Sequence, residues 1–159
     1  MDKVHALSYD YKMTQLASNK KAYFDYEILE TYEAGIELKG YEVKSIKAGH
    51  INLAGSYVVI KDGQAWLLNA DVSPYQPANM PSDYDSKRSR RLLLKSEEIS
   101  ELTGKAHEKS LTIVPLKVYN KHRLVKIEIG LGRGKKKADK REIIRTRETK
   151  REIDRILKN

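Results

Sequence analysis

The chain has 159 residues, no Cys, and 31 Lys or Arg against 22 Asp or Glu, which gives a formal net charge of +9. This length predicts one domain with a tail, and the lack of Cys excludes disulfides, thiolate zinc sites and catalytic thiols. Because the four histidines are scattered and no apolar run approaches the roughly 20 residues of a bilayer span, we expect no metal, no cofactor and no membrane segment. The amino terminus lacks the pattern of a secretory signal, so we expect a cytoplasmic protein.

Residues 1–18 show no clear apolar period, and we predict a mobile leader there. Alternating aromatic and β-branched residues predict a strand over residues 26–38, bent near a glycine. The apolar spacing over residues 41–48, followed by Gly49, predicts a short helix with a glycine cap.

Asp62-Gly63 lies between two alternating segments, residues 57–61 and 64–70, and is the strongest hairpin signal in the chain. Residues 73–89 contain three of the four prolines together with several Ser, Asn and Asp. This composition predicts an irregular loop that crosses the surface.

The remaining body residues predict one more helix and three more strands. A strand is expected over residues 91–94, followed by a helix over 95–103 that ends at Gly104. Residues 111–119 and 124–131 alternate well enough to be paired strands.

These elements predict a mainly β fold, an oligonucleotide-binding-type antiparallel β-barrel with two or three short helices and a basic C-terminal tail. Closure of the barrel removes exposed sheet edges, and one core suffices at this size. A two-layer open sheet with helices on one face is the structural alternative. The expected division is a leader over residues 1–18, a barrel over 19–132 and a tail over 133–159.

Most of the excess positive charge lies in the tail, where residues 133–159 contain 12 Lys or Arg and 5 Asp or Glu. A basic extension on an almost neutral body favours a nucleic-acid partner, because phosphate contacts release counterions. A solvated tail that only aids solubility is the alternative. Residues 130–135 lack the spacing of a P-loop and predict a flexible hinge.

The tail itself is rich in helix formers but has few apolar residues, so it has no wide face to bury. Isolated helices of this length are marginal in water. We therefore predict that residues 133–159 are disordered when free and become helical when they bind a polyanion.

No carboxylate has the spacing of an acid–base site, so we predict that the protein is not an enzyme and that Glu33, Glu42 and Asp71 lie on the solvated surface. A nuclease that uses His50 or His122 as a base is a weak alternative. The chain has ten Tyr and one Phe, and aromatic rings outside the core can stack on unpaired bases. The four aromatic candidates for such stacking are Tyr23, Phe24, Tyr75 and Tyr84.

Six short strings occur in order between Asn19 and the carboxyl terminus. They are Asn19-Lys-Lys-Ala22, Tyr32-Glu-Ala-Gly-Ile36, Gly40-Tyr-Glu-Val-Lys-Ser-Ile46, Val72-Ser-Pro-Tyr75, Arg88-Ser-Arg-Arg-Leu-Leu-Leu94 and Gly134-Lys-Lys-Lys-Ala-Asp-Lys-Arg141. Together they resemble the small protein B (SmpB) family, the SsrA-binding proteins that bind tmRNA in bacterial trans-translation. Six strings in the same order are far more specific than any one of them.

The resemblance implies a barrel that binds the tRNA-like domain of tmRNA and delivers it, with elongation factor Tu, to stalled ribosomes. The residues that it places against tmRNA are Asn19, Lys20, Lys21, Glu33, Leu93 and Lys126. Lys126 is a cation suited to phosphates, and Asn19 is a small donor and acceptor. Glu33 has an alternative role as an exposed strand residue in an ion pair. Leu93 has an alternative place in the core, because strand register decides whether it or a neighbouring Leu faces the RNA.

The resemblance also implies that the tail enters the vacant mRNA channel and becomes helical beside ribosomal RNA of the decoding centre. The matching tail residues are Gly134, Lys135, Lys136, Lys137, Asp139, Lys140 and Arg141. Asp139 would pair with nearby cations or cap the new helix. The residue before Asp139 is often Tyr or His in the family, and Ala138 removes that ring. A monomer is expected, and the functional alternative is a structural ribosomal or ribosome-assembly protein.

Overall fold

The computed structural model describes residues 13–108 and 111–158. Its strands are β1 (Thr14–Ser18), β2 (Tyr26–Ile36), β3 (Ile51–Asn52), β4 (Tyr57–Lys61), β5 (Gln64–Leu68), β6 (Asp71–Val72), β7 (Arg90–Leu93), β8 (Leu111–Lys121) and β9 (Leu124–Gly134). Its helices are α1 (Lys20–Asp25), α2 (Gly40–Lys47), α3 (Ser96–Ala106), α4 (Lys137–Leu157) and the short 3₁₀ helix η1 (Pro77–Asn79). Among the described residues, no helix combines the length and the apolar character that a membrane crossing needs.

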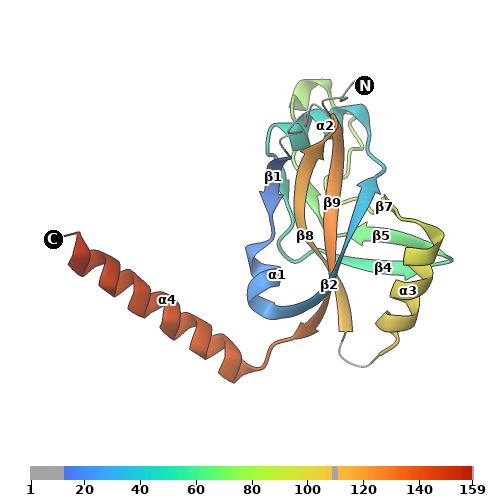
Figure 1. Ribbon diagram of the computed structural model, residues 1–159. Helices are drawn as coiled ribbons and strands as arrows, with labels where there is room; N and C mark the ends of the chain where they lie inside the picture. Colours follow the sequence, from blue (N-terminus) through green and yellow to red (C-terminus); the bar gives the residue numbers. More distant parts are fainter. Residues whose placement is uncertain (1–12, 109–110, 159) are drawn as a thin grey trace, which may run out of the picture.

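Six strands close into an antiparallel barrel (Figure 1). The order around the barrel is β4-β5-β7-β2-β9-β8, and the pair of Val58 in β4 with Ile113 in β8 completes the ring. β1 pairs with β8 further along the strand, and β3 and β6 form a separate two-stranded sheet. The predicted antiparallel barrel is therefore confirmed, and the open two-layer sheet is not formed.

The main core fills the barrel, because alternate residues of each strand point inward. Leu67, Leu92 and Ile127 are typical members and are almost fully buried. Two helices complete this core, since α2 contributes Ile46 and α3 contributes Leu102.

A second, smaller apolar cluster lies under α1. Ala22 packs against Val114 and Leu116 of β8, and Tyr26 and Ile28 of β2 are packed against the same cluster. This cluster fixes α1 on the barrel, directly before β2 begins.

Two glycines of β9 allow the close packing of this second cluster. A Cβ atom at Gly130 would lie 2.8 Å from Leu116 Cδ1, and one at Gly132 would lie 2.9 Å from Tyr26 Cβ. Both glycines are buried strand residues. The flexible hinge predicted over residues 130–135 is therefore wrong for residues 130–134, which belong to β9, and packing explains two of the three glycines. A Cβ atom at the third, Gly134, would have no neighbour within 4 Å.

Gly130→Ala is expected to lower the free energy of unfolding by about 1–3 kcal/mol, because the added methyl group overpacks Leu116 and Ile28. Gly104→Ala is the matched control. Gly104 lies inside α3, and outside its own helix backbone and chain neighbours no atom lies within 4 Å of its Cβ position, so this change should stabilise the protein by about 0.5–1 kcal/mol. Urea denaturation of both variants measures the difference, and equal effects of the two changes would contradict the packing argument.

The backbone at two glycines has the conformation that the sequence predicts. Asp62 and Gly63 both have positive φ angles, 53° and 71°, as a two-residue hairpin turn requires. Gly49 follows α2 with a φ of 85°, which matches the predicted glycine cap.

The structure corrects the boundary of the leader and the end of the second helix. Thr14–Ser18 were assigned to the mobile leader, but they form β1 because β8 offers them a partner edge; residues 1–12 lie outside the described residues. The second predicted helix ended at Gly104, whereas α3 continues to Ala106. A single glycine costs a helix only about 1 kcal/mol, which the burial of Leu102 in the core offsets.

Candidate nucleic-acid interface

A groove of about 230 Å³ lies at the carboxyl end of β2, and two of the predicted RNA-binding residues line it. In the strand register Gly35 pairs with Leu93 of β7 on one side and with Lys126 of β9 on the other. Leu93 is 51% exposed, whereas Leu92 is 2% exposed. The register therefore turns Leu93 outward beside Lys126 and leaves Leu92 in the core.

The same outer face carries three lysines and two glutamates from β2, β8 and β9. Lys117 pairs with Glu128 at 3.3 Å, and Lys121 pairs with Glu33 at 3.2 Å. Lys126 makes no ion pair with any residue that the structure describes. Its positive charge contributes to the lowered pKa of Glu33, and a contact between Lys126 and a phosphate stays a prediction.

Glu33 accepts hydrogen bonds from the Tyr119 hydroxyl and from Lys121 Nζ. The bond from Tyr119, followed by that from Lys121, holds the pKa of the Glu33 carboxyl below its ordinary value. Glu33 thus occupies the ion-paired strand position that was its alternative role. A direct contact between Glu33 and RNA stays a prediction.

Asn19 is buried and serves as the N-cap of α1. Its Oδ1 accepts from Ala22 N at 3.2 Å, and its Nδ2 donates to Pro115 O at 2.8 Å. The side chain is thus occupied by backbone contacts, whereas the neighbouring Lys20 and Lys21 are exposed. The structure thus gives Asn19 a capping role in α1, and its contact with RNA stays a prediction.

Both parts of the predicted site are hydrogen-bonded to the same strand, β8. Asn19 is bonded to Pro115 of β8, and Glu33 is bonded to Tyr119 four residues further on. At roughly 3.3 Å per residue these two points are about 13 Å apart along β8. The structure therefore groups Glu33, Leu93 and Lys126 closely and places α1 at some distance along the barrel.

The tail begins where β9 ends and continues as a helix. β9 runs to Gly134, two residues past the predicted domain boundary, and no residue of α4 is buried. Asp139 Oδ2 accepts from Lys136 N at 3.3 Å and caps the first turn, which is one of its two predicted roles. Figure 1 shows α4 projecting away from the barrel. The disorder expected for the free tail stays a prediction.

Three tail cations contact α1, and one of them is Arg147, which lies 5.6 Å from the centroid of the Phe24 ring. Lys135 Nζ donates to Tyr23 O at 2.9 Å, and Lys140 Nζ lies 3.0 Å from Asp25 Oδ1 and 5.8 Å from the centroid of the Phe24 ring. The hydrogen bond from Lys140 lowers the pKa of Asp25. The other cations of the predicted tail motif are exposed, and they are Lys136, Lys137 and Arg141.

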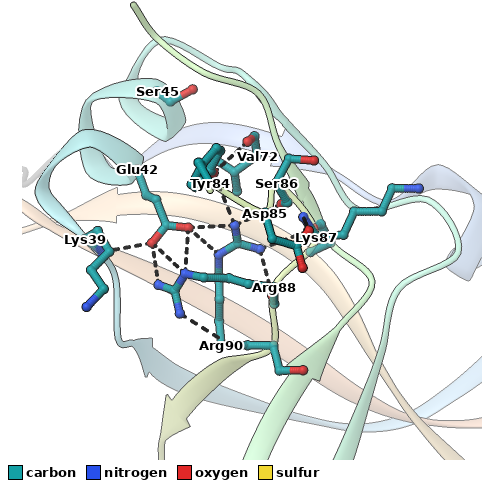
Figure 2. A network of polar contacts seen from close by, with 12 residues as sticks. Lys39, Glu42, Ser45, Val72, Tyr84, Asp85, Ser86, Lys87, Arg88 and Arg90 are labelled. Carbon is teal, nitrogen blue, oxygen red and sulfur yellow. Dashed lines mark hydrogen bonds and ion pairs between the residues drawn. The ribbon is translucent and has the colours of Figure 1, made fainter. Parts of the chain in front are cut away.

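A buried ionic network lies next to α2 and was missed by the sequence analysis. Glu42, predicted to be on the solvated surface, is 0% exposed and pairs with Arg90 and Arg88 (Figure 2). Lys39 N donates to the same carboxylate at 2.9 Å. The signal that the prediction overlooked is that Glu42 precedes Ile46 by four residues and so shares the buried face of α2.

The four aromatic candidates have different surroundings. Tyr84 donates to Val72 O at 2.8 Å inside the network, and Phe24 lies under the tail cations. Tyr23 and Tyr75 are 43% and 46% exposed. These last two are the most exposed of the four, and the Tyr75 ring lies beside that of His50, with centroids 6.5 Å apart.

The closed ring of strands, the outward groove lined by Lys126 and the cationic helical extension define an oligonucleotide-binding-type β-barrel protein. The family model of the SmpB protein matches residues 16–159. The chain therefore belongs to the SmpB family.

Known proteins resemble this chain over most of its length. An SsrA-binding protein of Gloeothece citriformis is 50% identical over 147 residues, which cover 92% of this chain and 95% of the relative. An SsrA-binding protein of a Synechocystis species is 48% identical over 143 residues, covering 90% and 93%. A solved chain from the structure "tmRNA-SmpB: a journey to the center of the bacterial ribosome" is 44% identical with a TM-score of 0.65, covering 81% of this chain and 94% of that chain.

Proposed function

We propose that this chain binds tmRNA, the RNA also called SsrA, and acts with it on the bacterial ribosome in trans-translation. The observation that carries the proposal is the match to the SmpB family over residues 16–159. The relatives named SsrA-binding protein and the neighbour from a tmRNA–SmpB ribosome structure support it. The proposal assigns the protein no catalytic step.

The barrel and the tail have separate tasks in this proposal. The groove with Leu93 and Lys126 meets the tRNA-like domain of tmRNA, and Glu33 orders the adjacent surface. Lys20 and Lys21 of α1 add cations to the same RNA contact. The tail occupies the empty mRNA channel, where the exposed cations Lys136, Lys137 and Arg141 meet ribosomal RNA phosphates. The protein works as a cytoplasmic monomer and reaches the ribosome with elongation factor Tu.

The direct test is to isolate the protein from cells and to sequence the RNA that copurifies with it. Strong enrichment of tmRNA over other transcripts of similar abundance is expected. The absence of any preference for tmRNA would overturn the proposal. Equal amounts of the protein on all ribosomes would instead favour the alternative of a structural ribosomal or assembly protein.

Lys126→Ala is expected to weaken tmRNA binding about tenfold at low salt, because one charge-assisted phosphate contact is lost. The slope of log affinity against log salt concentration should fall by about one unit. Lys61→Ala is the matched control, since Lys61 is an exposed lysine at the end of β4, outside the groove. Binding titrations at several salt concentrations measure both effects. The phosphate contact is refuted if both variants lose affinity equally.

A further inference from the structure

A second groove, of about 360 Å³, lies between α2 and the loop that contains η1. Its lining combines two aromatic rings, a cation and two side-chain amides, contributed by Tyr41, Lys44, Tyr75, Gln76 and Asn79. Small-ligand sites typically measure roughly 300–1,000 Å³. This groove is therefore large enough for one planar heterocycle, and its groups differ from those of the first groove.

Hydrogen bonds and an aromatic contact fix the walls of this second groove. Ser45 Oγ donates to Ser73 O, which fixes the start of the loop on α2, and Ser73 N donates to His50 O at 3.1 Å. Tyr84 packs edge-on against Tyr41, with the ring centroids 5.4 Å apart.

Tyr84 is in turn anchored in the buried ionic network shown in Figure 2. The ring of Tyr41 therefore packs against a side chain, Tyr84, whose position is fixed by hydrogen bonds. A site that is organised before its ligand arrives loses less conformational freedom on binding.

The polar groups of the groove are suited to the edge of a nucleobase. Asn79 Nδ2 donates to Gln76 Oε1 at 2.7 Å. This bond leaves Asn79 Oδ1 as an acceptor and Gln76 Nε2 as a donor, and no described residue bonds to either atom. An acceptor beside a donor matches the hydrogen-bonding edge that an unpaired base presents.

The second groove adjoins the first one across α2. Val43 lines the first groove, and Tyr41 and Lys44 line the second. Lys47 Nζ donates to Arg123 O at 3.3 Å, which ties α2 to the turn between β8 and β9. The exposed lysines Lys44 and Lys47 thus lie along the ridge between the grooves. An RNA chain that leaves the first groove over α2 meets cations for its phosphates and then the aromatic rings.

We infer that the groove between α2 and the η1 loop binds one unpaired base of the tmRNA held by the barrel, stacked on Tyr75. The inference rests on the proposed function. Gln76 and Asn79 contact the edge of the base, and Lys44 contacts its phosphate. A base that stacks on an aromatic side chain contacts the face of the ring. RNA binding should therefore weaken when the ring is removed and should change little when only the ring hydroxyl is removed.

The test uses the full-length protein and full-length tmRNA. Tyr75→Ala should weaken binding on the order of tenfold, as expected for one lost base stack. Tyr75→Phe keeps the ring and should bind like the wild type, whereas Tyr75→Leu keeps apolar area without a ring and should be as weak as Tyr75→Ala. Circular dichroism melting verifies that the variants are folded. In a second measurement, tmRNA transcribed with 4-thiouridine should crosslink to the peptide that contains Tyr75.

The outcomes separate this inference from the proposed function. If the wild type shows no preference for tmRNA over other transcripts, both fail. If the wild type prefers tmRNA but Tyr75→Ala binds equally well, only the base site fails. A Tyr75→Phe variant that is as weak as Tyr75→Ala would also overturn the base site, because the hydroxyl and not the ring would then be required.

Discussion

Replacement of Glu42 by Gln is expected to lower the free energy of unfolding by about 3–5 kcal/mol, because it leaves buried guanidinium charge without its counter-ion. The side chains of Glu42 and Arg90 are 0% and 1% exposed, and Arg88 binds the same carboxylate. Arg90 also donates to Ala70 O and Ser86 O, so its guanidinium cannot turn to solvent without breaking these bonds. Chemical denaturation followed by circular dichroism measures the loss.

The pH dependence of this loss has a defined sign. Burial alone raises the pKa of Glu42, but the hydrogen bonds from Arg88, Lys39 N and Arg90 outweigh burial and hold it below its ordinary value of 4.5. A carboxyl whose pKa is lowered in the folded state stabilises the fold above its unfolded pKa, and this contribution disappears as the pH falls through the folded pKa. The difference between wild type and Glu42→Gln should therefore be constant near neutral pH and should shrink below about pH 4.5.

Glu37→Gln is the matched control for Glu42→Gln. Glu37 is an exposed carboxylate directly after β2, so its replacement should change stability by less than about 0.5 kcal/mol. A loss below about 1 kcal/mol for Glu42→Gln, or a loss of equal size for Glu37→Gln, would contradict the assignment of the network as a buried ionic pair.

Replacement of Lys135, Lys136, Lys140 and Arg141 by Ala should abolish peptide tagging on stalled ribosomes and leave tmRNA affinity close to that of the wild type. The four cations lie beyond the barrel grooves, and each lost phosphate contact weakens ribosome binding through counterion release. The contact of Lys140 with Asp25 is a surface pair, worth about 0–1 kcal/mol, so the barrel should stay folded. A tagging assay with a transcript that lacks a stop codon, together with tmRNA titrations, measures both quantities.

The control for this variant keeps the charge at all four positions. Lys135→Arg, Lys136→Arg and Lys140→Arg combined with Arg141→Lys should retain tagging, because phosphate contacts require mainly a cation. A large loss of tmRNA affinity in the alanine variant would show that the tail belongs to the tmRNA site, and the division of tasks between barrel and tail would then be wrong.

Much of the fold, together with the charge and family of the chain, can be predicted from short-range features of the sequence. The turn at Asp62-Gly63 needs positive φ angles, and only a few residue types adopt them without strain. Strand periodicity over residues 111–119 and 124–131 depends on neighbours two positions apart. The excess positive charge after residue 132 is likewise a property of the chain alone, as is the resemblance of its six strings to one family.

The sequence by itself thus determined the six strands of the barrel, the hairpin, the cationic tail and the family, because each depends on residue types and short spacings. Only the tertiary structure decided that Leu93 faces outward, that Glu42 is buried beside arginines 46 and 48 residues away, and that Asn19 caps α1 against β8. It also decided that Gly130 is a packing residue. The physical reason is that exposure, charge pairing and close packing depend on partners distant in the chain, which local periodicity does not encode.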